Sequence, residues 1–176
     1  HNSLLIDVEN YPGVEFMQRI RPYYRHIILV GGVSYPPANE IARYVNLQIY
    51  QGELFDYPAS ATALNGPEYL IIDKHYAECE PDPRGPVIVC MGGRDPFNLT
   101  PISIAALGGI GHRVIAIRGP AAKWVPEDYQ GNAGLELVDS PDSLVPYFDR
   151  ASLAVVTTGM TCYEALAAGV PVLLTN

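Results

Sequence analysis

The chain has 176 residues, of which 48% are hydrophobic and 17% charged, and its 19 acidic residues outnumber the 11 basic ones to give a formal charge of −8. This composition excludes a disordered chain. The acidic balance excludes nonspecific nucleic-acid binding, which needs a basic face to neutralise phosphates, and no apolar run approaches the roughly 20 residues that span a bilayer. Three cysteines without Cys-x-x-Cys spacing and the lack of a signal-like opening favour reduced thiols and a cytoplasmic location.

Apolar runs of strand length alternate with stretches of helical period, which is the pattern of a parallel sheet wound with crossover helices. In the first half we expect strands at 4–6, 27–30 and 47–50, a helix at 13–23, and a short helix after Pro36 and Pro37 that runs through Tyr44. From 51 to 67 the chain carries Gly, Pro, Asn and Ser, so we expect an irregular stretch there.

In the second half the predicted strands are 87–91, 113–117, 135–138, 153–156 and 172–174, and the predicted helices are 99–107, 140–148 and 161–168. Clustered prolines at 80–86 favour extended backbone and predict a linker. We therefore expect one Rossmann-like domain at 1–79 and a second at 87–176. The chain opens almost directly in a predicted strand and stops at the end of another, where a parallel strand would normally lead into a loop and a helix. We therefore expect both domains to be truncated at the ends of the chain.

A glycine-bearing turn follows the predicted strand at 87–91. Gly92 and Gly93 would let backbone amides approach a ligand, and the helix that follows would offer partial positive charge to a phosphate. The alternative, and the commoner use of such a turn, is a plain strand-to-helix connection with Asn98 or Thr100 as the helix cap. Neither a P-loop nor a complete dinucleotide fingerprint is present.

A second turn of this kind follows the predicted strand at 153–156. Thr158, Gly159, Met160 and Thr161 open a helix whose first N–H groups could meet a phosphate, and Glu164 could accept hydrogen bonds from a ribose. The alternative is a capping box, with Thr161 as N-cap and Glu164 at the third helical position. The presence of two such turns after strands of one sheet favours the functional interpretation, because open parallel sheets bind ligands beyond the carboxyl ends of their strands.

The residues of both turns also resemble known families. The segment 163–171, Tyr-Glu-Ala-Leu-Ala-Ala-Gly-Val-Pro, resembles the nucleotide-sugar signature of family-28-type GT-B glycosyltransferases. More closely, segment 92–100, Gly-Gly-Arg-Asp-Pro-Phe-Asn-Leu-Thr, resembles a stretch of the UDP-2,4-diacetamido-2,4,6-trideoxy-β-L-altropyranose hydrolases, which act in pseudaminic acid synthesis and are related to spore-coat polysaccharide proteins. The segment from Gly66 to Tyr76 is similar to the interdomain segment of that family.

The resemblance implies a GT-B pair of domains, with residues 1–79 forming the C-terminal part of the first and 87–176 binding UDP. It implies that a UDP-sugar is the partner and that no cofactor is needed. The implied binding residues are Gly92, Gly93, Asp95, Asn98, the backbone at Ile117, Thr158, Gly159, Met160, Thr161 and Glu164.

The implied reaction is hydrolysis at the anomeric carbon of the sugar, which releases UDP. Members of the family activate water with a histidine in a glycine-rich turn near the N-terminus of the enzyme, and no histidine of the predicted first domain lies in a Gly-x-x-His sequence. The four histidines, at 1, 26, 75 and 112, are better interpreted as surface or structural residues, so the catalytic residues are unknown. No spacing indicates a metal site. The alternatives are a UDP-sugar-dependent glycosyltransferase, a scaffold that binds the nucleotide-sugar without catalysis, and a protein in which both turns are only helix caps.

Overall fold

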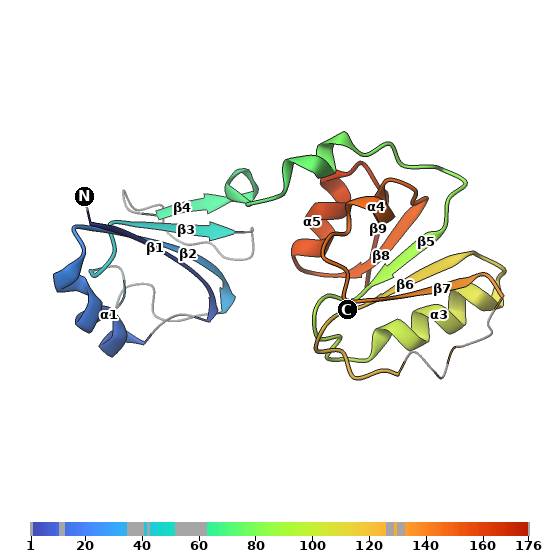
Figure 1. The fold of residues 1–176 in the computed structure, drawn as a ribbon, viewed down its shortest axis with the longest axis horizontal. Coiled ribbons are helices and arrows are strands. Elements are labelled where there is room, and N and C mark those ends of the chain that lie inside the picture. Colours follow the sequence, from blue (N-terminus) through green and yellow to red (C-terminus); the bar gives the residue numbers. More distant parts are fainter. Residues whose placement is uncertain are drawn as a thin grey trace. The chain divides into compact units, whose positions relative to one another are not determined.

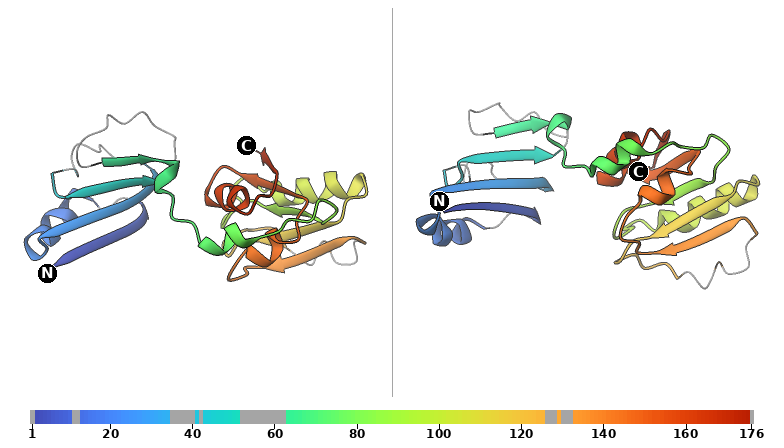
Figure 2. Two further views of the ribbon diagram at one scale, coloured as in Figure 1. Left: turned by 90° about the horizontal axis from the view of Figure 1, so that it is seen from above. Right: turned by 45° about the horizontal axis from the view of Figure 1, so that its top comes forward.

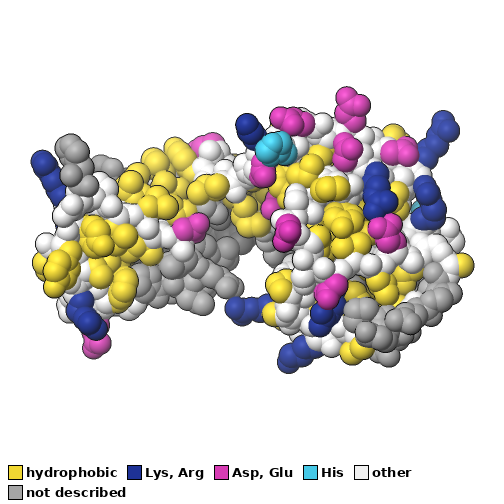
Figure 3. Space-filling view, viewed as in Figure 1, with side chains coloured by type: hydrophobic (Ala, Val, Ile, Leu, Met, Phe, Trp, Pro, Cys, Tyr) yellow, Lys and Arg dark blue, Asp and Glu magenta, His cyan; other side chains and the backbone are white. Residues whose placement is uncertain are grey.

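The computed structural model describes residues 2–10, 13–34, 41, 43–51, 63–125, 129 and 133–175. The chain divides into two compact units, residues 1–71 and 72–176, and each unit contains its own sheet (Figure 1). No helix in the described ranges is long and apolar enough to cross a membrane. On the face drawn in Figure 3, the described Lys and Arg side chains are scattered among acidic and apolar ones and form no continuous basic patch.

The first unit contains a parallel sheet with the strand order β1-β2-β3-β4. Its elements are β1 (Ser3–Asn10), α1 (Val14–Ile20), η1 (Arg21–Tyr23), β2 (His26–Ser34), β3 (Leu47–Gln51), β4 (Ala63–Gly66) and η2 (Pro67–Tyr69). Met17 of α1 is fully buried against Ile27 and Leu29 of β2, with Ile41 and Val45 completing the core. The predicted strands and the helix at 13–23 are confirmed, while most of the helix predicted before Tyr44 lies outside the described residues.

The stretch predicted to be irregular contains β4. Ala63, Leu64, Asn65 and Gly66 carry no strand signal, since alanine, asparagine and glycine are all depleted in strands. They form a strand because they pair in parallel with Gln48 to Gln51 of β3. This strand therefore exists through a partner distant in sequence.

The second unit contains a parallel sheet with the strand order β7-β6-β5-β8-β9. Its elements are η3 (Lys74–Glu78), β5 (Val87–Cys90), α3 (Leu99–Gly109), β6 (Val114–Arg118), β7 (Leu135–Asp139), α4 (Val145–Phe148), β8 (Leu153–Thr157), α5 (Met160–Ala167) and β9 (Val172–Thr175). All five predicted strands and the helices at 99–107 and 161–168 are confirmed to within two residues at their ends.

Both faces of this second sheet are covered, as in a doubly wound fold. Alternate residues of a strand point to opposite faces, so Ile88 and Cys90 of β5 pack in one cluster while Val87 and Val89 pack in another. Helix α3 lies over the second cluster, and α4, α5 and η3 lie over the first (Figure 2). The near-continuous apolar character of β5, which lies in the middle of the sheet, follows from this double burial.

The helix predicted at 140–148 is shorter than expected. Ser140 adopts a left-handed backbone, with φ of 44°, and its N–H donates to the carbonyl of Arg118 at 2.9 Å. The Ser143 hydroxyl accepts the N–H of Val145 at 3.2 Å, and α4 covers only Val145–Phe148. The first residues of the segment are thus held by β6 and are not available to a helix.

The boundary between the units falls at Ile71 and Ile72, ahead of the predicted linker at 80–86. Tyr76 of η3 is 5% exposed and belongs to the core of the second unit, with its ring centroid 6.0 Å from that of Phe148. The proline-rich segment is also held by this unit, since the Glu80 N–H donates to Asp149 Oδ1 at 2.8 Å and Arg113 Nη2 donates to the Arg84 carbonyl at 2.8 Å. Residues 72–86 therefore follow the second unit, and the backbone predicted to be extended at 80–86 contains a turn, in which the Gly85 N–H donates to the Asp82 carbonyl at 2.8 Å.

Candidate functional site

The two glycine-bearing turns follow neighbouring strands in the centre of the second sheet. β5 and β8 pair in parallel, with Cys90 opposite Val156. From β5 the chain passes through α3 to β6 on one side, and from β8 it passes through α5 to β9 on the other side. This reversal is the topological switch point at which open parallel sheets bind ligands. The structure thus places both predicted turns at the carboxyl end of the same sheet, after two neighbouring central strands.

The first turn is organised by Asp95, which is only 6% exposed. Its Oδ1 accepts the N–H of Leu99 at 2.8 Å and its Oδ2 accepts the N–H of Thr100 at 3.0 Å. Asn98, one of the two residues predicted as the cap, makes no side-chain cap hydrogen bond. Asp95 caps α3 in its place, and its carboxylate is directed at the helix and not toward a ligand.

We predict that Asp95→Ala lowers the free energy of unfolding by about 1–2 kcal/mol, because it removes both acceptors from the first turn of α3. Asp95→Asn keeps one acceptor and should lose less. Urea unfolding followed by tryptophan fluorescence measures both values. Asp142→Ala, at an exposed acidic residue, is the matched control, and an equal loss in Asp142→Ala and Asp95→Ala would contradict the capping role.

The two glycines of the first turn differ in backbone conformation and in their surroundings. Gly92 has a left-handed backbone with φ of +73°, whereas Gly93 borders open space, since a Cβ added there would meet no heavy atom within 4 Å. The Gly93 carbonyl accepts the N–H of Ala121 at 2.9 Å, which ties this turn to the loop after β6. The outer side of Gly93 is therefore accessible to a ligand.

The second turn leaves the start of α5 uncapped. Gly159 occupies the N-cap position and makes no side-chain cap hydrogen bond. Thr161 lies inside the helix, so the predicted capping box with Thr161 as N-cap is wrong. Thr158, Gly159 and Met160 are all exposed. No side chain therefore caps the first N–H groups of α5, whereas the Asp95 carboxylate caps those of α3.

Glu164 lies one turn into α5 and is half-buried beside Tyr76 of η3. Burial raises the pKa of Glu164, and the hydrogen bond from the Tyr76 hydroxyl opposes that rise. Burial, together with the charge of Glu164, raises the pKa of Tyr76 to about 12, so the tyrosine stays a donor at neutral pH. Tyr76 is not among the site residues predicted from the sequence, since nothing local marks a tyrosine as the neighbour of a glutamate so far along the chain.

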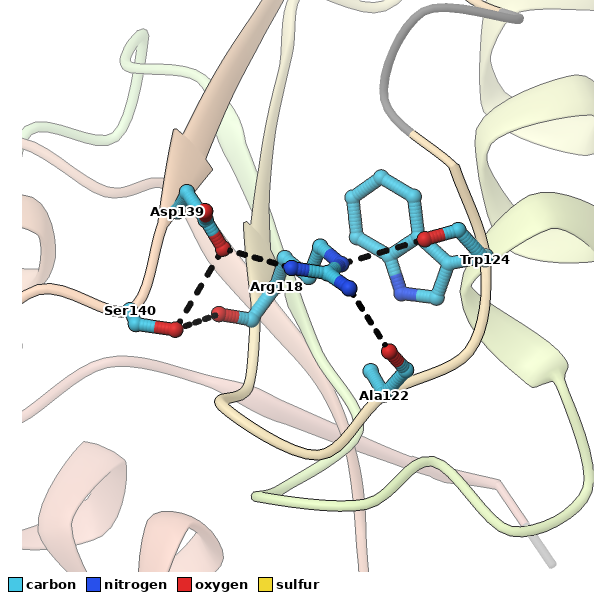
Figure 4. Close-up of polar contacts among 5 residues, drawn as sticks. All are labelled: Arg118, Ala122, Trp124, Asp139 and Ser140. Atoms are coloured by element: carbon cyan, nitrogen blue, oxygen red, sulfur yellow. Dashed lines mark hydrogen bonds and ion pairs between the residues drawn. The ribbon is translucent and has the colours of Figure 1, made fainter.

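Ile117 and Arg118 end β6 and shape the loop that follows. The Ile117 side chain is 3% exposed and belongs to the core, so only its backbone could contact a ligand, as the resemblance implies. Arg118 reaches across the loop, with Nε donating to the Trp124 carbonyl at 3.1 Å and Nη2 to the Ala122 carbonyl at 2.9 Å (Figure 4). Its Nη1 pairs with Asp139 Oδ1 at 3.0 Å. The guanidinium therefore holds the loop against the end of β7.

The described residues include no group of three or more His, Cys, Asp or Glu side chains that could hold a metal. The sequence predicts surface or structural histidines; His26, His75 and His112 are exposed, and His1 lies outside the described residues. His75 is paired with Asp73, with Nδ1 2.6 Å from Oδ1, and this partner raises the pKa of His75. Asp73 and His75 thus form an exposed pair at the start of η3.

The fold of the chain is similar to that in a crystal structure of MurG from Acinetobacter baumannii. The TM-score is 0.58 at 14% sequence identity, and the match covers 97% of this chain and 52% of the MurG chain, so this chain spans about half the length of that protein. No protein-family model matches the sequence, and a search of the curated proteins finds no significant match. At this identity the likeness is one of fold, and it confirms the predicted α/β architecture with two parallel sheets of GT-B type.

Proposed function

We propose that the second unit binds the diphosphate of a UDP-sugar at the start of α5, with Glu164 accepting hydrogen bonds from the ribose. The observation that carries the proposal is the uncapped N-terminus of α5 at the switch point of the sheet. A helix start of this kind directs N–H groups and partial positive charge at an anion. This explains how a chain with a formal charge of −8 could hold a diphosphate.

Three further observations support the same ligand. Gly93 and Gly159 both have open space where a side chain would be, so a ligand could approach the backbone of both turns. The sequence of both turns resembles nucleotide-sugar families, and the fold is like that of MurG. Asp95, which the resemblance implies as a binding residue, has a structural role in this proposal, because both oxygens of its carboxylate accept N–H groups of α3.

The test is calorimetric titration of the chain with UDP and with UDP-N-acetylglucosamine, for the parent and for Gly159→Ala. The added methyl meets no atom within 4 Å in the protein, so the substitution introduces no clash and should cost less than about 1 kcal/mol at this N-cap position. The methyl would, however, occupy the space through which a phosphate reaches the amides. We expect the affinity for both ligands to fall about tenfold or more. Gly108→Ala in α3, also in open space, is the matched control. Parent protein that binds neither ligand at millimolar concentration would refute the proposal.

For the intact protein we propose hydrolysis of the nucleotide-sugar. Water would attack the anomeric carbon, the bond from that carbon to the phosphate oxygen would break, and UDP would leave with the bonding electron pair while a base takes a proton from the water. A glycosyltransferase would instead need a sugar acceptor, and a scaffold would bind without turnover. Sustained UDP release without an acceptor supports hydrolysis, release only with an acceptor supports transfer, and binding without release supports the scaffold.

Glu164→Gln should separate binding from stability. A carboxyl whose pKa is raised in the folded state holds its proton more tightly when folded, so stability falls as pH rises from the unfolded pKa through the folded one. Glutamine has no charge to bury. We therefore expect Glu164→Gln to melt at a higher temperature than the parent at pH 7 and at nearly the same temperature at pH 4.

The same variant should bind UDP about tenfold more weakly at pH 7, because the ribose hydroxyls lose a charged acceptor. Thermal melts at the two pH values and titration with UDP measure the two effects. A variant that melts as the parent does at both pH values would show that burial of Glu164 has no cost. A variant with unchanged UDP affinity would remove Glu164 from the proposed site.

A further inference from the structure

Helix α3 is apolar on both of its sides. On the inner side, Ile104 is 5% exposed and belongs to the cluster that covers the second sheet. On the outer side, Ile102 is 63% exposed and Ile110, the C-cap of the helix, is 71% exposed. Three small exposed residues lie between them at the spacing of one helix face. We name the five residues of this side the outer face of α3: Ile102, Ala105, Ala106, Gly109 and Ile110.

The outer face lacks the charged side chains that a surface helix usually presents to water. Segment 96–111, which contains the whole of α3, has no Asp, Glu, Lys, Arg or His. A helix that is hydrophobic all round is normally buried on all sides. An exposed apolar patch on a folded protein is a mark of an interaction surface.

The order of residues along the outer face suits a second copy of the same face. Ile102 and Ile110 lie four residues before and four residues after Ala106. If two copies of α3 pack antiparallel about a two-fold axis at Ala106, Ile102 of each copy meets Ile110 of the other, and the two Ala106 side chains face each other. The small side chains at the centre let the helices approach to the short end of the roughly 8–10 Å that separates packed helix axes.

The charge of the protein also favours a second copy on an uncharged face. Each copy has a formal charge of −8, so two copies repel each other, and the cost of contact is smallest where the meeting surfaces carry no charge. A bilayer fits this helix less well. Helices that lie on membranes are rich in Lys and Arg on their polar side, which segment 96–111 lacks, and an anionic surface would repel the chain.

We propose that the outer face of α3 is a self-association surface, on which two copies of the chain pack antiparallel as a two-fold dimer centred on Ala106. The distance from Ile102 to Ile110 is about 12 Å at the rise of an α-helix, so the contact is smaller than the standard interface between stable partners. We therefore expect a weak dimer, with a dissociation constant on the order of 10–100 µM. Dimerisation through α3 is independent of the proposed UDP binding at the start of α5.

Sedimentation equilibrium of the chain at about 5 to 500 µM covers the expected dissociation constant. Ala106→Glu would place two carboxylates opposite each other at the axis, and we expect it to weaken the dimer at least about tenfold. Glutamate suits an exposed helical position, so folding should be unchanged, and circular dichroism checks this. Ala77→Glu, at an exposed alanine of η3, makes the same change in net charge and should dimerise as the parent does.

A mixing experiment distinguishes the two-fold contact from general aggregation. Ala106→Lys should also be monomeric alone, whereas an equimolar mixture of Ala106→Glu and Ala106→Lys should associate, because each glutamate then meets a lysine at the axis. No association in the mixture would overturn the proposed arrangement. A parent chain that is monomeric at about 500 µM, or Ala106→Glu that associates as the parent does, would overturn self-association through α3. A monomeric parent that binds phosphatidylcholine vesicles would do the same and assign the face to a membrane.

Discussion

Phe148→Ala is expected to lower the free energy of unfolding of the second unit by about 3–5 kcal/mol, the range for truncating a fully buried aromatic residue. Phe148 is 0% exposed and is the last residue of α4. Its ring packs on Tyr76, so the cavity left by truncation would lie between η3, α4 and the sheet. Urea unfolding followed by the fluorescence of Trp124 reports on this unit, because the single tryptophan belongs to it.

The same substitution should also weaken UDP binding if the proposed site is correct, since Tyr76 supports Glu164 and Phe148 supports Tyr76. Phe97→Ala is the matched control for stability, because the Phe97 ring is 73% exposed and its removal should change the free energy of unfolding by less than about 0.5 kcal/mol. A Phe148→Ala variant no less stable than Phe97→Ala would contradict the assignment of this core.

Gly119→Ala should have the next largest effect, about 1–3 kcal/mol of destabilisation. A Cβ at Gly119 would overlap the carbonyl oxygen of Gly92 and lie 2.6 Å from the Cα of Gly93. Both contacts are with backbone, which cannot rotate away as a side chain can. The loop after β6 and the first turn would have to separate, and the hydrogen bond from Ala121 N–H to the Gly93 carbonyl would be strained or lost.

Because Gly119 supports the turn that carries Gly93, its substitution should lower UDP affinity together with stability. Gly108→Ala, which meets no atom within 4 Å, should leave the affinity unchanged and slightly stabilise α3. Urea unfolding and UDP titration of the two variants make the comparison. Equal stability of Gly119→Ala and Gly108→Ala would mean that the backbone at 92–93 accommodates the methyl group without cost.

The strands of the second unit illustrate what local sequence determines. Each of the strands β5, β6 and β8 is an apolar run bounded by turn residues, and burial on both faces requires that run wherever the strand lies in a doubly wound sheet. The positions of these strands and of the two glycine-bearing turns could therefore be predicted. The position of both turns at the same end of the sheet also follows from parallel pairing, since the carboxyl ends of parallel strands lie side by side.

The roles within the turns could not be predicted in the same way. Asp95 and Asn98 both have side chains able to cap α3, and only the folded loop, with left-handed backbone at both residues, directs the Asp95 carboxylate at the helix. Likewise, Thr161 and Glu164 have the spacing of a capping box, but the helix begins at Met160 and Glu164 packs toward Tyr76 instead. Competing local hydrogen bonds differ by little energy, so tertiary contacts decide among them.

The α/β class, the parallel strands and the two turns could be predicted from local patterns, because each depends on burial that repeats within a few residues. The strand at Ala63–Gly66, the position of residues 72–86 in the second unit and the contact of Tyr76 with Glu164 all depend on long-range contacts in the folded chain. In each of these cases the stabilising partner is distant along the chain, as β3 is for β4 and α4 is for η3. Contacts of that kind impose no hydrophobic periodicity on the segment that they stabilise, so the sequence of that segment does not indicate them.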